Sequence, residues 1–263
     1  MSFTLFQPDY QPQPFDFNRK NFEKLPLSEQ SQYLPNFINA YLLARISQLS
    51  YKSSVNAKHS DKSYRDAIRC TLMISGISYE DAKKTIFLNS RDIVLDIEGN
   101  YIPGTQGLII FHDKTAIISF RGSEKKINDW SSNFKVKRVD FTHRKGKVHR
   151  GFLSAFDAVI PEEGKHKLEF DDVIERLKKC QYVWLTGHSL GGAIAIVAAN
   201  FLQKKGVNIS GIYTFGAPRV GNKDYRDYVN NLLKNKYWRF MHDHDVVPQI
   251  PHFKSSILYY KFV

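Results

Sequence analysis

Ser189 lies at the centre of a glycine-rich segment that is typical of a serine nucleophile. The segment is Gly187-His188-Ser189-Leu190-Gly191-Gly192, with glycines two positions before and two positions after the serine. An apolar run over 182–185 precedes it, and small residues over 193–199 follow it. A strand that turns sharply into a helix lifts the serine oxygen out of the backbone and directs the helix amides at a developing oxyanion. The pattern predicts a nucleophile elbow, with a purely structural glycine-rich turn as the alternative.

Four further motifs accompany this serine, two before it and two after it. They are Phe120-Arg121-Gly122-Ser123, Val148-His149-Arg150-Gly151-Phe152, Thr214-Phe215-Gly216-Ala217-Pro218 and Asp245-Val246-Val247-Pro248. In this order and spacing the motifs resemble the fungal-type (class 3) lipase family of α/β-hydrolases, over roughly residues 37–252. The resemblance implies a serine hydrolase that cleaves carboxylic esters of lipids, such as acylglycerols, through an acyl-enzyme. Neither a cofactor nor a metal ion is expected.

The acid and the base of the predicted site differ in how well the sequence marks them. A serine hydroxyl needs an imidazole to accept its proton and a carboxylate to orient that imidazole, in the chain order serine, acid, histidine. The resemblance assigns the acid to Asp245, and Asp243 is the alternative because residues two apart on a strand point the same way. Among the nine histidines only His252 follows Asp245. In the family the interval is longer, so the base stays unassigned: either His252 reaches Asp245, or the sequence is truncated, or the triad has been lost.

The oxyanion hole and a lid complete the expected site. The backbone amide of Leu190 is one oxyanion donor by its position after the nucleophile. The resemblance assigns the other donor to Ser123, whose alternative role is that of a loop serine capping the next helix. It also places a lid over 124–132, with Ile127 and Trp130 as its apolar residues. Trp130 is equally interpretable as an anchor packed into the body.

The elements that must position these residues alternate along the chain. Helical spacing of apolar residues is found at 37–51, 63–74 and 78–84, and short β-branched runs follow at 86–88, 93–97, 107–111 and 116–120. After residue 130 we expect helices over 152–159 and 170–179 and strands over 182–186, 211–215 and 237–242. Such alternation predicts an α/β-hydrolase fold with a mostly parallel central sheet and helices on both faces. Residues 37–263 form this domain, and 1–36 form a Pro- and Phe-rich N-terminal arm.

Composition sets further limits. The 263 residues are 42% hydrophobic, which is enough to bury one large core. The longest nearly apolar stretch, 193–202, is too short to span a bilayer, and residues 1–8 lack the features of a secretory signal. These features favour a cytoplasmic protein, with export by a signal-independent route as the alternative. The two cysteines, Cys70 and Cys180, are expected to be reduced and partly buried thiols.

The formal net charge of +12 is concentrated in one stretch. Between residues 135 and 150 a single acidic residue, Asp140, stands among Lys135, Lys137, Arg138, Arg144, Lys145, Lys147 and Arg150. The stretch is interpreted either as a solvated face or as a surface that meets anionic lipid. Nucleic acid is not an expected partner, because no zinc-ligand pattern or RNA-recognition motif accompanies these charges.

Three functions are consistent with this sequence. The first is a lipase or esterase acting on acylglycerols. The second is a phospholipase or acyltransferase on the same scaffold. The third is a catalytically incomplete lipase-like protein that binds lipid or a partner. The catalytic histidine separates the first two from the third.

Overall fold

The computed structural model describes most of the predicted domain. The described residues are 37–51, 66, 68–70, 72–73, 77–89, 94–95, 101–102, 106–122, 138–140, 146–160, 167–242 and 245–250. The predicted arm, residues 1–36, lies outside them, and so does the segment after residue 250.

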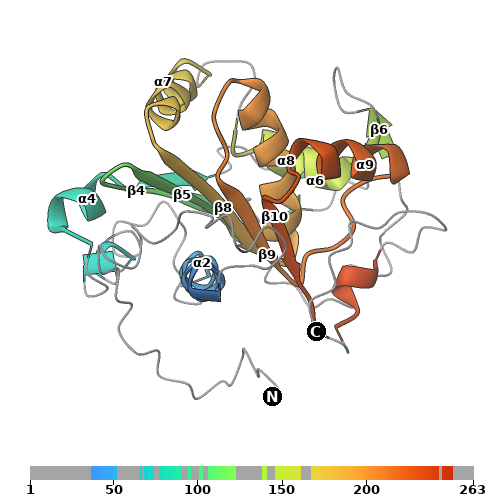
Figure 1. The fold of residues 1–263 in the computed structure, drawn as a ribbon, viewed down its shortest axis with the longest axis horizontal. Helices are drawn as coiled ribbons and strands as arrows, with labels where there is room; N and C mark the ends of the chain where they lie inside the picture. Colours follow the sequence, from blue (N-terminus) through green and yellow to red (C-terminus); the bar gives the residue numbers. More distant parts are fainter. Residues whose placement is uncertain are drawn as a thin grey trace.

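A six-stranded sheet organises the domain, in the order β1-β4-β5-β8-β9-β10 (Figure 1). These strands are β1 (Ile86–Asn89), β4 (Gln106–His112), β5 (Thr115–Phe120), β8 (Tyr182–His188), β9 (Gly211–Phe215) and β10 (Tyr237–Phe240). The ladders from β5 through β10 are parallel, whereas β1 and β4 pair antiparallel to their neighbours. The predicted mostly parallel sheet is therefore confirmed, and the carboxyl ends of four strands share one edge.

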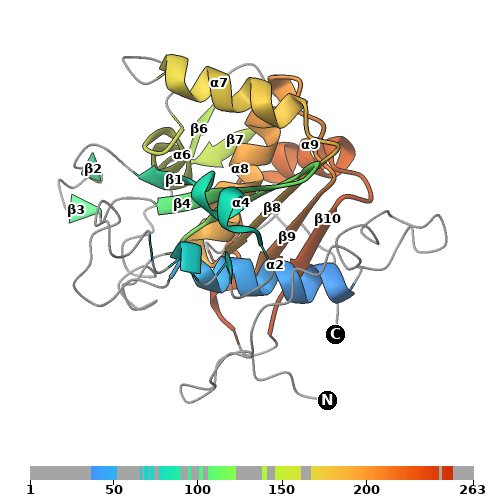
Figure 2. The same ribbon diagram turned by 90° about the vertical axis from the view of Figure 1, so that its left-hand side faces the viewer.

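Helices cover both faces of the sheet, which gives two separate cores (Figures 1 and 2). On one face pack α6 (Arg150–Asp157), α7 (Lys167–Lys178), α8 (Leu190–Lys204) and α9 (Lys223–Leu232). On the other pack α2 (Phe37–Leu49), α4 (Tyr79–Lys83) and the helical residues 68 and 72. Side chains of β8 alternate between the cores, since Val183 and Leu185 belong to the first and Trp184 to the second.

The sequence of α8 explains why this helix lies at the centre of the first core. Every residue from Leu190 to Leu202 is buried. Glycine and alanine occupy much of this stretch, and small side chains let a helix approach a sheet closely. Because all sides of the helix are buried over 190–202, α8 has no solvent-facing polar side there. Within the described residues, no helix has both the length and the apolarity needed to cross a membrane.

Several elements differ from the prediction. The run predicted as a strand over 93–97 contributes β2 (Val94–Leu95), which pairs with β3 (Tyr101–Ile102) in a two-stranded sheet separate from the central one. A second small sheet joins β6 (Arg138–Asp140) to β7 (Lys147–His149), and this pairing and α9 were not predicted. The polar character of α9 hid it, because only its face with Tyr225 and Val229 is buried.

The two cysteines are both free in the structure. Cys180 is partly buried, as expected, and its thiol contacts the carbonyl of Arg176 at 3.5 Å. The prediction of burial was wrong for Cys70, which is exposed. The helical residues around it turn Ile68 and Leu72 toward the core, and residue 70 therefore faces away.

Candidate active site

Ser189 connects β8 to α8 in a backbone conformation that L-residues rarely adopt. Its φ is 54° and its ψ is −126°, and such conformations cost on the order of 1–3 kcal/mol unless the surroundings fix them. Here the Ser189 amide donates to the Phe215 carbonyl at 2.9 Å, which continues the β8–β9 ladder through the turn. Its side chain makes no capping hydrogen bond to the helix that it precedes. The structure thus builds the predicted elbow with Ser189 at its apex.

The glycines of the motif are required because backbones approach closely here. A Cβ atom at Gly191 would overlap the Phe120 carbonyl at the end of β5, and one at Gly187 would overlap the backbone of Gly191. The first turn of α8 therefore sits directly against the carboxyl ends of β5 and β8. No side chain larger than hydrogen fits at either position without displacing the turn.

The oxyanion side of the elbow is only partly described. Leu190 is the first residue of α8, where backbone amides have no acceptor within the helix. The chain after β5 passes the elbow at Gly122, where a Cβ atom would lie 2.6 Å from the His188 carbonyl. Gly122, the last described residue before Ser123, thus lies beside the residue that precedes the nucleophile. Ser123 itself, Ile127 and Trp130 lie outside the described residues, so their predicted roles stay predictions.

Tyr51, just beyond the end of α2, joins these segments. Its hydroxyl lies 3.0 Å from His188 Nδ1 and donates toward the His188 carbonyl at 3.3 Å. The Gly122 amide also hydrogen-bonds to the Tyr51 oxygen. Burial raises the pKa of Tyr51 well above its ordinary value, against the opposing effects of that amide and of the Arg121 charge. The phenol therefore stays protonated and acts as a fixed hydrogen-bonding group between α2, β5 and the elbow.

His188 and Asp245 both lie close to Gly216, just after the end of β9. A Cβ atom at Gly216, whose φ is +59°, would be 2.9 Å from Asp245 Oδ2 and 3.5 Å from His188 Nε2. Burial lowers the pKa of His188, and the Asp245 carboxylate opposes that shift. His188 is therefore neutral at pH 7, with Nδ1 at the Tyr51 hydroxyl.

Asp245 follows β10 in a loop that is held by backbone and side-chain bonds. Its amide donates to the His242 carbonyl at 3.0 Å, and its Oδ1 accepts from the Val247 amide at 3.0 Å. The buried Arg239 guanidinium on β10 donates to the Ala217 carbonyl at 2.6 Å and to the Pro248 carbonyl at 2.8 Å. These bonds tie the loop after β9 to the loop with Asp245. The predicted acid thus lies at the sheet edge that carries Ser189, whereas Asp243 and His252 lie outside the described residues.

Residues 117–255 match the family model described as lipase (class 3), which is slightly more than half of the chain. The chain belongs to the class 3 lipase family. Its elbow, its parallel sheet edge and the Asp245 loop are the parts that fall within the matched region.

Individual relatives of this class 3 lipase domain agree with the family match. A triacylglycerol lipase of Arabidopsis thaliana is 29% identical over 247 residues, covering 73% of this chain and 47% of the relative. A secreted mono- and diacylglycerol lipase of Fusarium solani is 36% identical over 140 residues, covering 52% and 40%. The chain thus spans less than half the length of these curated relatives.

Solved structures show the same fold. The triacylglyceride lipase of Rhizomucor miehei superposes with a TM-score of 0.55 at 25% identity, over 84% of this chain and 78% of that one. A triacylglycerol lipase whose catalytic centre is described as a serine protease triad has a TM-score of 0.55 at 26% identity, over 86% and 76%. The predicted α/β-hydrolase fold is confirmed.

Two residues near the site were not found from the sequence. Tyr51 stands at the end of a predicted helix and belongs to no motif, so its contact with an elbow 137 positions away could not be anticipated. Arg239 had a weak signal, because it is a charged residue inside an aromatic strand, between Trp238 and Phe240. A charge at such a position is buried only if acceptors meet it.

The Tyr51 contacts predict a measurable stability effect. Tyr51→Phe should lower the free energy of unfolding by about 1–3 kcal/mol, because it leaves buried polar groups of His188 and Gly122 without the hydroxyl. Urea denaturation measures the change. Tyr182→Phe is the matched control, since the bond that its hydroxyl accepts from Gln181 is exposed, and it should stay within about 0.5 kcal/mol of the wild type. Equal effects in the two variants would contradict a special role for Tyr51.

Proposed function

We propose that this class 3 lipase is a serine hydrolase that cleaves carboxylic esters of lipids, such as acylglycerols, through an acyl-enzyme at Ser189. The observation that carries the proposal is the strained elbow, which presents a serine without a capping bond at a helix N-terminus. A strained backbone conformation persists only where the surrounding structure fixes it, and such conformations cluster at functional sites. The choice of acylglycerol esters is supported by two relatives, which are named as a triacylglycerol lipase and a mono- and diacylglycerol lipase.

In the proposed reaction Ser189 Oγ attacks the ester carbonyl and an imidazole accepts its proton. The Leu190 amide, together with Ser123, stabilises the tetrahedral oxyanion, and each such donor typically contributes about 2.7–4 kcal/mol to the transition state. Collapse of the intermediate expels the alcohol, which takes the proton from the imidazole. Water then releases the acid by the same steps. The site requires no metal ion for this chemistry.

Asp245 is proposed to orient that imidazole and to stabilise its charged form. Support comes from its place at the sheet edge of Ser189 and from the bonds that fix its loop. The relative described with a serine protease triad supports the same division of roles. The imidazole itself is unassigned, and His252 is the candidate that the chain order offers.

The nucleophile is tested by covalent labelling. A fluorescent phosphonate should label the purified protein, and Ser189→Ala should abolish labelling because the reactive oxygen is gone. Labelling is read on a denaturing gel and by mass spectrometry of the labelled peptide. Ser154→Ala, on α6, is the control and should label like the wild type. Persistent labelling of the Ser189→Ala variant would place the nucleophile elsewhere.

The acid is tested by two isosteric variants. Asp245→Asn should reduce ester hydrolysis by orders of magnitude, because an amide cannot hold the imidazole in the working tautomer. Asparagine keeps an oxygen for the Val247 amide, so circular dichroism and unfolding should change little. Asp243→Asn should have a mild effect on kcat. The opposite ranking of the two variants would show that the motif is assigned two residues too late.

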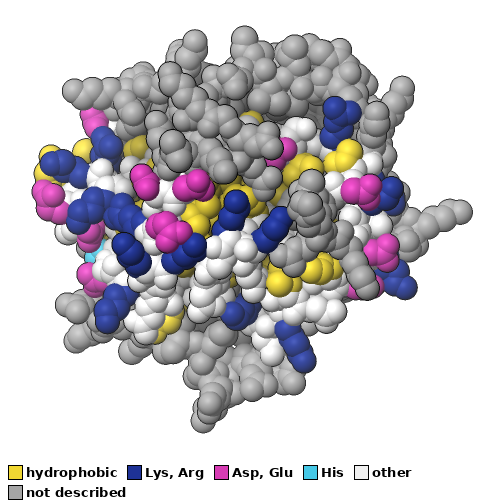
Figure 3. Space-filling view, turned by 90° about the horizontal axis from the view of Figure 1, so that it is seen from above, with side chains coloured by type: hydrophobic (Ala, Val, Ile, Leu, Met, Phe, Trp, Pro, Cys, Tyr) yellow, Lys and Arg dark blue, Asp and Glu magenta, His cyan; other side chains and the backbone are white. Residues whose placement is uncertain are grey.

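We further propose that the basic stretch over 135–150 meets anionic lipid. Its described basic residues, Arg138, Lys147 and Arg150, are all exposed, and Lys147 lies 3.8 Å from Asp140. On the face shown in Figure 3, acidic and basic side chains are interspersed among the described residues. A mixed face of this kind attracts anionic lipid only weakly by charge, so the proposal rests on the stretch over 135–150.

Vesicle binding decides between the two interpretations of this stretch. Replacing Lys135, Lys137 and Arg138 by glutamine should weaken binding to anionic vesicles by about 1 kcal/mol per charge at low salt. Sedimentation with vesicles of anionic or zwitterionic lipid measures it. Binding should fall as salt approaches 1 M, where the Debye length is about 3 Å. Binding that ignores both salt and headgroup would identify the stretch as a solvated face.

A further inference from the structure

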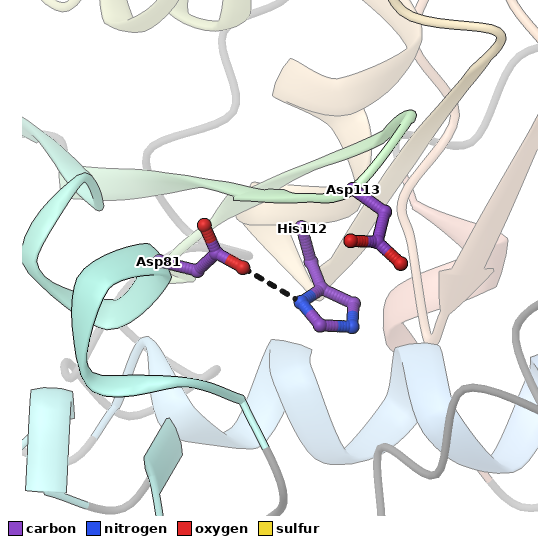
Figure 4. Close-up of side chains that lie close together, drawn as sticks. All are labelled: Asp81, His112 and Asp113. Carbon is purple, nitrogen blue, oxygen red and sulfur yellow. Dashed lines mark hydrogen bonds and ion pairs between the residues drawn. The ribbon is translucent and has the colours of Figure 1, made fainter.

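Three metal-ligating side chains meet at a place that the proposed hydrolysis does not use. Asp81 on α4 and His112 and Asp113 at the β4–β5 hairpin each offer one ligand atom, and these atoms all lie within 4.8 Å of one another (Figure 4). Asp81 Oδ2 is 3.1 Å from His112 Nδ1. Two ligands of one tetrahedral cation at about 2.0–2.1 Å stand a little more than 3 Å apart, so this pair already has the required spacing.

The backbone holds all three groups without help from a ligand. The Asp81 amide donates to Ser78 Oγ at 3.1 Å, which fixes the first turn of α4. His112 is the last residue of β4 and pairs with Thr115 across the hairpin. Asp113 begins the turn, with a φ of 49°. Two rigid elements therefore present the donors, which reduces the ordering that binding must impose.

Burial and charge at this cluster suit a cation that enters from solvent. The side chains of His112 and Asp81 are 16% and 19% exposed, and Asp113 is exposed. Lys84 lies 3.1 Å from Asp81 Oδ1, so that oxygen is engaged while Oδ2 faces the imidazole. The cluster therefore brings two carboxylates and one imidazole together, with the Lys84 ammonium beside Asp81.

We propose that Asp81, His112 and Asp113 form a binding site for a divalent transition-metal cation, with zinc as the best fit. One imidazole nitrogen and two carboxylate oxygens are ligands that zinc accepts, and a water molecule would complete four-coordination. Calcium is disfavoured, because it takes oxygen ligands and needs six or more of them. No metal ion is expected from the sequence, in which Asp81 and His112 are 31 positions apart.

The site is structural, because it lies at the far end of the sheet from Ser189. The hairpin is at the start of β5, whereas the elbow adjoins the end of β5 and β8. The six residues of β5 separate the two ends by roughly 20 Å. A bound cation would tie α4 to the β4–β5 hairpin and so reinforce the antiparallel edge of the sheet.

Zinc titration of the metal-free chain tests the proposal. Isothermal calorimetry should show a saturable site for ZnCl2 that is not reproduced by CaCl2, and zinc at a hundredfold excess over Kd should raise Tm by about 5 °C. His112→Ala and Asp113→Asn should each weaken this binding at least about tenfold, because loss of a direct ligand costs no less than loss of an outer partner. Asp224→Asn, an exposed aspartate on α9, is the matched control and should bind zinc like the wild type.

A fourth variant keeps the test decisive if a ligand variant misfolds. Lys84→Met removes the ammonium next to Asp81 and should tighten zinc binding, an effect that loss of structure cannot produce. Weaker or unchanged binding in Lys84→Met would overturn the role of Asp81. Absence of saturable zinc binding, or equal affinity in wild type, His112→Ala and Asp113→Asn, would overturn the site. None of these outcomes depends on ester hydrolysis, so the site and the proposed function can fail separately.

Discussion

Helix α8 approaches the sheet so closely that its first turn lies against the Phe120 carbonyl, and the position of the proposed nucleophile follows from that contact. The approach is possible only because Gly187 and Gly191 carry no side chain where backbone meets backbone. It accompanies the unusual conformation of Ser189 and places Gly191 beside Phe120 and Arg121, where the chain leaves β5. The burial of the whole helix from Leu190 to Leu202 supplies the apolar area that keeps the strained turn in place.

On the opposite face of the sheet, polar contacts position α2 and Tyr51 against the elbow at Ser189. Buried hydroxyls connect α2 to the strands: Thr186 Oγ1 donates to the Leu43 carbonyl at 3.1 Å, and Ser50 Oγ lies 3.1 Å from Ser119 Oγ. Because hydrogen bonds are directional whereas apolar packing is not, these contacts fix where α2 ends along the sheet. That end point delivers Tyr51 to the elbow. The proposed active site is thus built between a steric contact on one face and a hydrogen-bonded helix on the other.

The fold and the nucleophile could be predicted because their signals are local. The alternation of β-branched runs with helical spacing, and the glycines around Ser189, each depend on residues that are neighbours in the chain. The partners of those residues could not be predicted in the same way. Tyr51 contacts a residue 137 positions away, and Asp81 contacts one 31 positions away. Neither periodicity nor motif spacing reports such contacts, and for Arg239 the sequence shows a charge in an aromatic strand but not its acceptors. The exposed Cys70 is a smaller example of a wrong prediction. Its residue type favoured burial, but its position on the helix faces away from the core.

The buried guanidinium of Arg239 also constrains how this domain can vary. It donates to carbonyls of two different loops, Ala217 after β9 and Pro248 after the acid. An insertion in either loop would move one acceptor away and leave a buried charge with less compensation, which is costly. The two loops must therefore keep matched lengths, and a change in one is tolerated only with a compensating change in the other. The backbone bonds of the turn after α8, at Gly206, lead back into α8, so length variation is expected to be cheaper there.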